Sequence, residues 1–248
     1  MKMSDVVRFY KKGRIGVISL EEKEHKNTFT KSFIHGLQTA FHKIDTDETI
    51  HVVLVHGYDN YFCCGGTKSE LRELAHGNAK FNEFGFFDVF LRCRLPIVAA
   101  MQGHAIGGGL AFGCYADVIV AAEQSIYSAN FMNYGFTPGM GATCIIPKKM
   151  GEAIGVEMLY SGKNYFGAEL KERGAGIKIV PKDAVINVAW DLAEELAKKP
   201  RESLMLLKEH LTSPLRLAVE QSIEHELKMH EKTFTHKDVI KRIEELYA

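Results

Sequence analysis

The 248-residue sequence has no excess of charge of either sign, because Lys plus Arg and Asp plus Glu both number 31. Nucleic-acid binding usually requires a basic surface, so this balance disfavours DNA or RNA as a partner. The sequence also lacks an apolar run of the roughly 20 residues that span a membrane, and its start, MKMSDVVRFYKKG, has no apolar stretch of signal length. We therefore expect a cytoplasmic protein with no membrane or nucleic-acid partner.

Cysteine is scarce and odd in number. Cys63, Cys64, Cys93, Cys114 and Cys144 lie in apolar or glycine-rich surroundings, without the paired spacing of a zinc site. They are expected to be reduced thiols, which fits an intracellular location. No arranged His/Asp partner is visible for Cys63 or Cys64, so we interpret them as small buried hydrophobes rather than nucleophiles.

Internal repeats and low-complexity segments are also missing. An apolar content of 46% and a charged content of 25% are those of an ordinary globular protein. At this length an α/β chain often forms one main domain with a small appendage, which is the organisation we expect.

The first part of the chain predicts a β-β-α-β order. Residues 6–10 and 13–20 are rich in β-branched and apolar side chains and are separated by the turn-like KKG, which predicts a hairpin. Apolar residues from Phe33 to Phe41 recur at helical spacing, behind Thr28 and Thr30 as candidate caps. The following HVVLVHG predicts a buried strand.

Two glycine-rich segments follow, each placed before a predicted helix. YDNYFCCGG, up to Gly66, predicts a loop, and Thr67 with Glu70 predicts a capping box that opens a helix. A further helix is expected from Asn82 to Cys93. PIVAAMQG predicts a strand, GHAIGGG a glycine-rich turn and LAFGCYA a helix.

The rest of the chain divides into an irregular segment and a helical region. VIVAA predicts a short strand, and the region from Ser125 to Gly141 lacks a period, so we interpret it as pocket lining. After Lys148 the pattern is mostly helical, with a short strand IKIV, a long helix from Ala184 to Lys198 and three further helical pieces. Pro200 and Pro214 are expected to interrupt these helical pieces, and the segment from Met229 to Thr235 is expected to connect two of them.

The glycine loops indicate an anion site of a particular kind. GHAIGGG lacks the spacing of a P-loop or of a dinucleotide fingerprint, which disfavours a nucleotide. Two such loops would present backbone N–H groups where a ligand can approach closely and develop negative charge, as an oxyanion hole requires. The alternative is that Gly107, Gly108 and Gly109 only permit close packing of a helix on a strand.

Four blocks in order, YFCCGGT, GHAIGGGLAFGCYADVIVAA, YGFTPGMGAT and GAELKERG, resemble the signature blocks of the crotonase (enoyl-CoA hydratase/isomerase) superfamily. The resemblance implies an α/β fold, a spiral of β-β-α units over residues 1–195, and a helical region over residues 196–248 that forms trimers and covers the pocket. It implies that the oxyanion donors are the N–H groups of Gly66 and Gly108. Their ligand would be an acyl thioester of CoA or acyl carrier protein.

Within this superfamily, hydratases use two glutamates, and the chain has Ala111 and Phe131 at the matching positions. Neither side chain can exchange a proton, which disfavours hydration. DNYF, MQGHAIGGG, YSANFMNYGFTPGMGAT and MHEKTF resemble the decarboxylases of polyketide β-branching cassettes. This implies that a 3-methylglutaconyl-type thioester on a carrier protein loses carbon dioxide and becomes a 3-methylcrotonyl-type thioester, with no metal or organic cofactor.

The same resemblance implies roles for three side chains. His230, in MHEKTF, would protonate the dienolate, and Lys80 would anchor the departing carboxylate, with Lys68 as its substitute. The alternatives are a surface histidine and solvated lysines. His104, beside the glycines, is a further candidate base, although packing is the favoured interpretation.

Substrate contacts are expected from the irregular segment, where an apolar lining would desolvate the carboxylate. Tyr127, Asn130 and Tyr134 can equally satisfy backbone groups in a loop without ladder partners. The competing functions are a Δ3,Δ2-enoyl-thioester isomerase, a hydratase and a non-catalytic thioester-binding scaffold. The candidates for substrate contact are Lys68, Ala111, Tyr127, Asn130, Phe131 and Tyr134, and the apolar lining would consist of Phe131, Phe136 and Ala111.

Overall fold

A computed structural model describes residues 6–78 and 85–247, and its strands form two sheets. The larger sheet is parallel except for the hairpin of its first two strands, and its order is β1 (Val7–Lys12), β2 (Ile15–Leu20), β3 (Val52–His56), β5 (Ile97–Met101), β7 (Val118–Ala122) and β10 (Lys178–Val180). The smaller sheet has the order β4 (Tyr61–Cys63), β6 (His104–Ile106), β8 (Ile126–Ser128) and β9 (Tyr165–Phe166). The predicted hairpin at residues 6–20 is confirmed.

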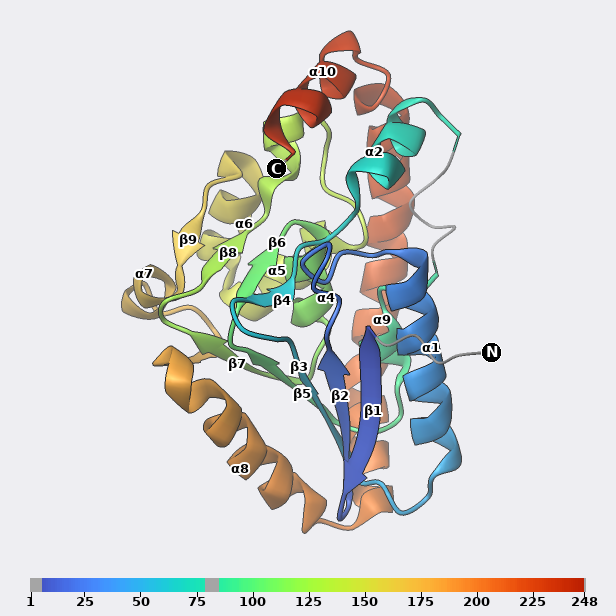
Figure 1. Cartoon of the computed structure of the whole chain (residues 1–248), viewed down its shortest axis with the longest axis vertical. Helices are drawn as coiled ribbons and strands as arrows, with labels where there is room; N and C mark the ends of the chain where they lie inside the picture. Colours follow the sequence, from blue (N-terminus) through green and yellow to red (C-terminus); the bar gives the residue numbers. More distant parts are fainter. Residues whose placement is uncertain (1–5, 79–84, 248) are drawn as a thin grey trace.

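The helices of the described residues surround these sheets (Figure 1). The first half of the chain contributes α1 (Lys31–Thr46), α2 (Lys68–Ala75), α3 (Val89–Arg92) and α4 (Gly108–Cys114). The second half contributes the 3-10 helices η2 (Asn130–Tyr134) and η3 (Lys182–Ala184) and the helices α5 (Ala142–Met150), α6 (Glu152–Ser161), α7 (Gly167–Glu172), α8 (Val185–Ala197), α9 (Arg201–Thr233) and α10 (Lys237–Leu246).

A β-β-α unit repeats along the chain. In each turn the first strand enters the larger sheet, the second enters the smaller sheet, and a helix follows: β3, β4 and α2, then β5, β6 and α4, then β7, β8 and η2. Each sheet therefore gains one parallel strand per turn, which is the expected spiral. The point where the second strand ends and the helix begins recurs at the same edge of the molecule.

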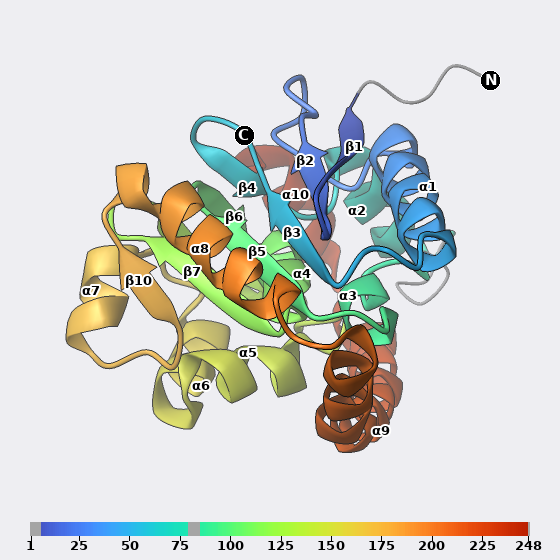
Figure 2. The same cartoon turned by 90° about the horizontal axis from the view of Figure 1, so that it is seen from below.

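The larger sheet is buried on both faces, as parallel sheets usually are. On one face, Val52, Leu54, Val98 and Val120 pack against α8, which lies across the strands (Figure 2). Alternate residues such as Val53 point to the opposite face and join the main core with α1 and α4. These alternating positions explain why the strands have apolar residues at nearly every place.

Two predictions for the glycine segments were wrong in part. The predicted loop up to Gly66 contains β4, and the predicted turn GHAIGGG contains β6, while α4 begins at Gly108 inside the glycines. The two three-residue strands are too short for a periodic pattern, and each depends on pairing with the other. Gly103 permits the close approach, because a Cβ there would lie 2.3 Å from the backbone nitrogen of Tyr61.

Two helix predictions also need correction. The described part of the predicted helix from Asn82 to Cys93 is helical only over Val89–Arg92, since Gly85 has a positive φ of 49°. The three expected C-terminal pieces are two helices, and α9 continues through Pro214 and Met229 to Thr233. Pro214 lies on the exposed side of α9, so water can bond the carbonyl that loses its helical partner.

The C-terminal helices are tied to the larger sheet by a buried lysine. The ammonium of Lys208 in α9 donates to the carbonyls of Phe90 and Leu95 and to the carboxylate of Asp117, at 2.8, 2.9 and 2.8 Å. The same carboxylate accepts the N–H of Ile97 at the start of β5. The division at residues 195 and 196 stays a prediction, but these contacts join the C-terminal region closely to the core.

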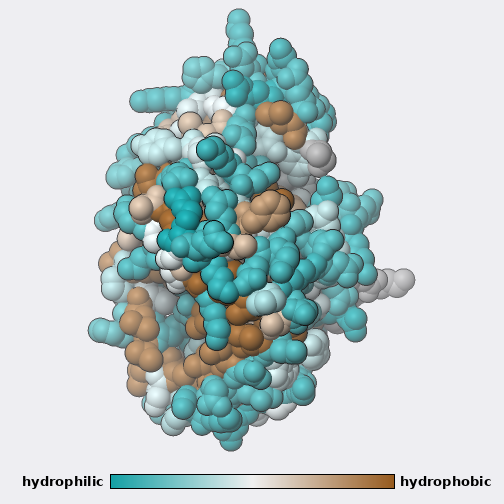
Figure 3. All heavy atoms as spheres, turned by 90° about the vertical axis from the view of Figure 1, so that its left-hand side faces the viewer, coloured by the Kyte–Doolittle hydropathy of each residue, from teal (hydrophilic) through white to brown (hydrophobic). Residues whose placement is uncertain are grey.

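On the surface that carries α7 and α8, apolar side chains gather in a band between polar ones (Figure 3). α9 adds large exposed apolar side chains at Leu206, Leu207, Leu211 and Leu217. Within residues 6–78 and 85–247, no helix has the length and apolar character needed to cross a membrane.

Candidate active site

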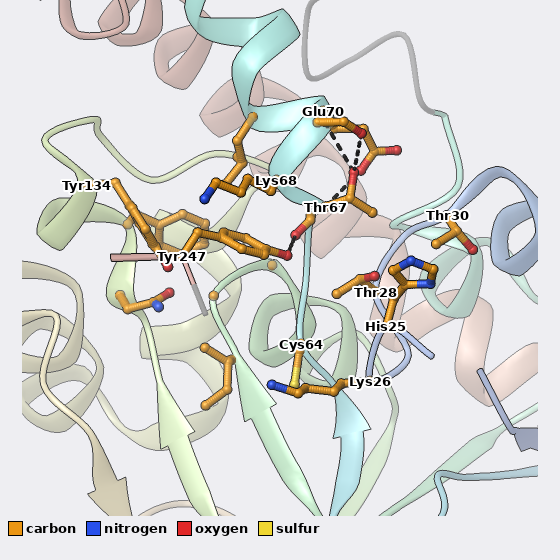
Figure 4. A pocket seen from close by; sticks show the side chains of 18 of the residues that line it. His25, Lys26, Thr28, Thr30, Cys64, Thr67, Lys68, Glu70, Tyr134 and Tyr247 are labelled. Atoms are coloured by element: carbon orange, nitrogen blue, oxygen red, sulfur yellow. Dashed lines mark hydrogen bonds between the residues drawn. The ribbon is translucent and has the colours of Figure 1, made fainter. Parts of the chain in front are cut away.

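A cavity of about 1010 Å³ lies at the edge where β4 and β6 lead into α2 and α4 (Figure 4). Its wall is completed by the segment 24–31, by η2 and by the end of α10. It is lined by Glu24, His25, Lys26, Thr28, Thr30, Lys31, Tyr61, Cys64, Gly66, Thr67, Lys68, Ser69, Glu70, Leu71, Arg72, His104, Ile106, Gly107, Gly108, Ile126, Asn130, Phe131, Tyr134, Phe136, Met140, Asn164, Leu246 and Tyr247.

The N–H of Gly66 is oriented by the peptide to which it belongs. The carbonyl of Gly65, in the same peptide, accepts the N–H of Phe29 at 2.8 Å. In a trans peptide the carbonyl and the N–H point in opposite directions, so the Gly66 N–H points away from Phe29. Because Gly66 lines the cavity, this orientation makes its N–H available to a ligand there.

The N–H of Gly108 is oriented in the same way. The carbonyl of Gly107 accepts the N–H groups of Leu110 and Ala111 at 3.1 and 3.3 Å, so it points along α4 and the Gly108 N–H points out of the helix. Within residues 6–78 and 85–247, neither the Gly108 N–H nor the Gly66 N–H bonds to a protein acceptor. Both N–H groups are therefore free to bond an oxygen atom of a ligand.

The two glycine loops touch each other. A Cβ on Gly65 would lie 3.0 Å from the nitrogen of Gly108, and a Cβ on Gly109 would lie 2.0 Å from the carbonyl oxygen of Cys63. Side chains at these positions would push the loops apart. The packing role expected as an alternative for Gly109 is thus real, and it also brings the two donors to one cavity.

Beyond Gly66 the cavity continues as a small apolar pocket of about 20 Å³. The two share the residues Gly66, Glu70, Leu71 and Met140. This volume is about that of one water molecule, so a larger ligand would enter only if a flexible lining side chain such as Met140 moved. The small pocket is lined by Phe29, Gly66, Glu70, Leu71, Leu74, Phe86, Phe87 and Met140.

The capping box at the start of α2 is confirmed and forms part of the cavity wall. The hydroxyl of Thr67 accepts the N–H of Glu70 at 3.2 Å, and the Glu70 carboxylate accepts the N–H of Thr67 at 3.0 Å. Burial raises the pKa of Glu70, against the lowering effect of its bonds to Thr67. Glu70 is therefore a carboxylate of the cavity wall as well as a helix cap, whereas sequence reasoning assigned it only to capping.

Lys26 brings a cation to the cavity that sequence reasoning missed. Lys26 and Asn27 have positive φ values of 58° and 56°, and the buried Asn27 amide holds this turn through the carbonyls of Leu20 and Phe62. The Lys26 ammonium lies 5.9 Å from the ring centre of Tyr61 and extends toward Cys64 (Figure 4). No periodicity signals such a turn, because its bonds come from distant segments.

Lys68 and Lys80 were both expected to bind the substrate carboxylate, and the structure places only Lys68. Lys68 lines the cavity, and its ammonium bonds the backbone carbonyl of Glu244 at 3.1 Å and pairs with the Glu244 carboxylate at 3.4 Å. Arg72 joins the same carboxylate. Lys80 lies outside the described residues.

His230 lies behind the cavity wall and is not among the described lining residues. Its Nε2 lies 2.8 Å from the carbonyl oxygen of Thr137, and its ring packs edge-on against Phe234 at 5.1 Å. Phe234 stacks in turn on Phe136, which lines the cavity. Burial lowers the pKa of His230. A direct role in proton transfer would require movement of residues 136–140 and stays a prediction.

The substrate-contact candidates fall into two groups. Asn130, Phe131, Tyr134 and Phe136 line the cavity, as does Lys68. Ala111 is buried within α4, and the hydroxyl of the fully buried Tyr127 bonds backbone groups of Met101 and Ala122. These two are outside the described lining, and the contacts of Tyr127 favour the backbone-satisfying alternative.

The side chains of His104 and Cys63 form hydrogen bonds to the backbone of neighbouring segments. Nδ1 of His104 accepts the N–H of Ile126 at 2.9 Å, and burial lowers the pKa of His104. The Cys63 thiol donates to the Asn27 carbonyl at 3.0 Å. Burial raises the pKa of Cys64 to about 11, which keeps it a thiol at neutral pH. All five cysteines are free.

The described residues offer one group with metal-ligand spacing, Glu22, Glu24 and His25. The Glu22 carboxylate already accepts the backbone N–H of His25 and lies 3.0 Å from its ring. These local bonds account for the cluster without an ion.

Thr28 and Tyr247 are two further cavity residues that sequence reasoning did not assign to the site. Thr28 is 4% exposed, and its hydroxyl has no hydrogen-bond partner in the described part of the chain. The Tyr247 hydroxyl donates to the Gly66 carbonyl at 2.5 Å. The positions of Thr28 and Tyr247 at the cavity depend on where distant segments meet in space, so no local sequence pattern could have identified them.

A family described as enoyl-CoA hydratase/isomerase matches residues 10–247 of the chain. The bacillaene synthase decarboxylase PksI of Bacillus subtilis is 45% identical over 231 residues, which are 93% of each protein. A probable enoyl-CoA hydratase of Rhizobium meliloti is 24% identical over 227 residues, 91% of this chain and 88% of that protein.

Solved structures agree with these relatives. A structure from a dehydratase/decarboxylase enzyme couple involved in polyketide β-branching has a TM-score of 0.96 and 43% identity, and the match covers 98% of this chain and 100% of that one. The ECH2 decarboxylase domain of CurF from Lyngbya majuscula has a TM-score of 0.92 and 36% identity, with 96% and 98% covered.

Proposed function

The chain belongs to the enoyl-CoA hydratase/isomerase family, and we propose that it is a decarboxylase of polyketide β-branching. Its substrate is a 3-methylglutaconyl-type thioester on acyl carrier protein, and its product is a 3-methylcrotonyl-type thioester. The observation that carries this proposal is the pair of N–H groups, Gly66 and Gly108, which line one cavity and meet no protein acceptor in the described part of the chain. The decarboxylases among its relatives support the reaction type.

The reaction balances without a redox partner. The bond between the γ carbon and the carboxylate breaks, carbon dioxide leaves, and the electron pair forms a new γ,β double bond. The former α,β pair becomes a double bond between the α carbon and the carbonyl carbon, and the carbonyl π pair moves to the thioester oxygen, which gives a dienolate. A proton then adds to the γ carbon and restores the α,β double bond, so we propose that no metal or organic cofactor takes part.

The two backbone donors supply the main stabilisation of the dienolate. Negative charge develops on the thioester oxygen, and a preorganised N–H aimed at such an oxygen contributes roughly 3–4 kcal/mol to the transition state. The small apolar pocket beside Gly66, which the rings of Phe29, Phe86 and Phe87 line, takes the distal end of the acyl group. Placing a carboxylate among these rings removes its hydration, which favours its departure as neutral carbon dioxide.

The side-chain roles belong to this proposal. Lys80 anchors the carboxylate, with Lys68 as its substitute, and His230 supplies the proton. Ala111 and Phe131 stand where hydratases of the family have glutamates, so the chain lacks the groups that activate water there. This difference favours decarboxylation over hydration in a shared fold.

We further propose that the protein works in the cytoplasm as a homotrimer or a dimer of trimers. The exposed apolar side chains of α9 support association through the C-terminal region. Light scattering of the purified protein measures the assembly, and a monomer would contradict this part of the proposal.

The test of the reaction is to incubate the protein with 3-methylglutaconyl-carrier protein and to measure the product by mass spectrometry. Loss of carbon dioxide supports the proposal. An unchanged mass with a moved double bond indicates an isomerase, the mass of one added water indicates a hydratase, and an unchanged substrate indicates a binding scaffold. The same acyl group on CoA measures the preference for the carrier.

A further inference from the structure

Tyr247, directly after α10, joins the C-terminal segment to the first glycine loop. Its side chain extends into the cavity, and the hydroxyl donates to the carbonyl of Gly66 at 2.5 Å (Figure 4). The two residues are 181 positions apart in the sequence. The contact therefore exists only when α10 lies over the cavity.

A second set of bonds holds α10 in this position. The carboxylate of Glu244, near the end of α10, pairs with Arg72 and Lys68 of α2, and Lys68 also donates to the Glu244 carbonyl. The ring of Tyr247 lies 6.4 Å from that of Tyr134 across the cavity. The end of α10 is thus fastened to α2 by charge and to the cavity wall by ring contact.

We propose that Tyr247 is a positioning residue of the oxyanion hole, which its hydroxyl holds in shape by fixing the peptide between Gly66 and Thr67. This inference rests on the proposed function only in the identity of the thioester. It assigns the C-terminal segment a part in catalysis beyond covering the pocket.

The argument follows the bonds around Gly66, which has no side chain to restrict its φ and ψ. The peptide before it is held by the Phe29 N–H on the Gly65 carbonyl. The peptide after it is held by Glu70 on the Thr67 N–H and by Tyr247 on the Gly66 carbonyl. Loss of the Tyr247 bond leaves the second peptide held only at the Thr67 N–H, so the chain after Gly66 can shift and carry the Gly66 N–H out of line with the ligand.

The charge distribution around Gly66 also supports a positioning role for Tyr247. The Gly66 carbonyl is a negative dipole end beside the place where negative charge develops on the thioester oxygen. The Tyr247 hydroxyl bonds this carbonyl and so offsets its repulsion of the anion. Burial raises the pKa of Tyr247, so the hydroxyl keeps its proton and remains a donor across the neutral range.

The test is the Tyr247→Phe variant, which removes the hydroxyl and keeps the ring. We expect kcat to fall about tenfold, the effect of one lost hydrogen bond in the transition state, and KM to change less than about twofold. Tyr160→Phe is the matched control, because Tyr160 is 79% exposed on α6 and away from the cavity. Glu244→Gln, which weakens the attachment to α2, should lower kcat in the same direction.

A spectroscopic readout separates positioning from a general structural effect. Infrared spectra of bound 3-methylcrotonyl-pantetheine, labelled with ¹³C at the thioester carbonyl, report how strongly the oxyanion donors polarise that carbonyl. We expect the downward shift of the carbonyl frequency on binding to shrink in Tyr247→Phe and to persist in Tyr160→Phe. Thermal unfolding of each variant confirms that the fold is intact.

The outcomes are distinct. A Tyr247→Phe protein that keeps both the carbonyl shift and kcat overturns the proposal, and so does a Glu244→Gln protein that keeps both if Tyr247→Phe does not fold. If the wild-type protein binds the labelled thioester with a shift that Tyr247→Phe loses, but does not release carbon dioxide, the positioning role stands and the proposed function fails.

Discussion

Single atoms decide how closely the two glycine loops approach. A Cβ on Gly108 would lie 2.9 Å from the sulfur of Met140 and 2.9 Å from a ring carbon of Phe29, which is closer than real Cβ contacts. A Cβ on Gly66 would meet only Leu71, at an ordinary 3.7 Å. The two glycines proposed as oxyanion donors therefore differ in their surroundings, and only at Gly108 does packing exclude a side chain.

This difference predicts unequal effects of the same substitution. Gly108→Ala should lower kcat by about 100-fold, because the methyl group displaces Met140 and Phe29 and moves the donor. Gly66→Ala keeps its N–H and has room for the methyl group, so its loss should stay below about tenfold. Turnover of the thioester substrate measures both. Equal losses in the two variants would refute the steric argument.

The two threonines before α1 predict stability changes of opposite sign. Thr28→Val replaces a buried hydroxyl without a partner in the described chain by a methyl group of the same shape, and should stabilise the unliganded protein by about 1 kcal/mol. Thr30→Val removes the cap that accepts the Phe33 N–H and should cost about 1 kcal/mol. Urea unfolding measures both. A destabilised Thr28→Val protein would show that the hydroxyl has a favourable role that its contacts do not reveal.

At the scale of elements, helices set the positions of loops that carry no regular structure of their own. The carboxylate of Glu226, buried in α9, accepts the N–H groups of Gly141 and Thr143 at 2.6 and 2.9 Å. It therefore caps the start of α5 and holds Met140, whose φ is +64°, against the small apolar pocket. Residues far apart in the chain thus shape the acyl end of the site through one side chain.

Lys208 predicts how much α9 depends on its attachment to the larger sheet. Lys208→Met would leave the carbonyls of Phe90 and Leu95 and the carboxylate of Asp117 without the ammonium, and should destabilise the protein by about 2–4 kcal/mol. This loss of stability is smaller than for a fully buried ion pair, because the Asp117 side chain is 25% exposed and water screens its charge. Lys198→Met, which breaks an exposed pair with Glu195, should leave the free energy of unfolding nearly unchanged, because water screens that pair. Similar effects of the two changes in urea unfolding would contradict this assignment.

At the scale of the whole molecule, the stability of the fold should depend on pH through His230. Burial lowers the folded-state pKa of His230 below its ordinary value of about 6.5, so the folded state favours the neutral ring. Its contribution to stability is complete above about pH 6.5 and is lost as the pH falls toward the folded-state pKa, because unfolding then takes up a proton.

The measurement is the free energy of unfolding as a function of pH for the wild type and for His230→Asn. The wild type should lose more stability on acidification through this window than the variant. The exposed His35→Asn protein is the matched control. If His230→Asn and the wild type show the same slope, burial of this ring does not control the acid response.

Features that depend on neighbours in the chain were predictable from the residues alone. The hairpin at residues 6–20, the Thr67–Glu70 capping box and the buried strands follow from periodicity and local bonding. The absence of glutamate at positions 111 and 131 was equally visible, and the prediction against hydration depends on it. These features involve partners only a few residues apart, or no partner at all.

The short strands of the smaller sheet and the positions of the C-terminal side chains could be known only from the folded structure. β4 and β6 exist because each supplies the other's hydrogen bonds across about 40 residues. Tyr247 reaches Gly66, and His230 lies behind Phe136 and Phe234, because α9 and α10 fold back over loops from the first half of the chain. The physical reason is that a contact between distant segments is set by the packing of everything between them, which no local pattern of residues encodes.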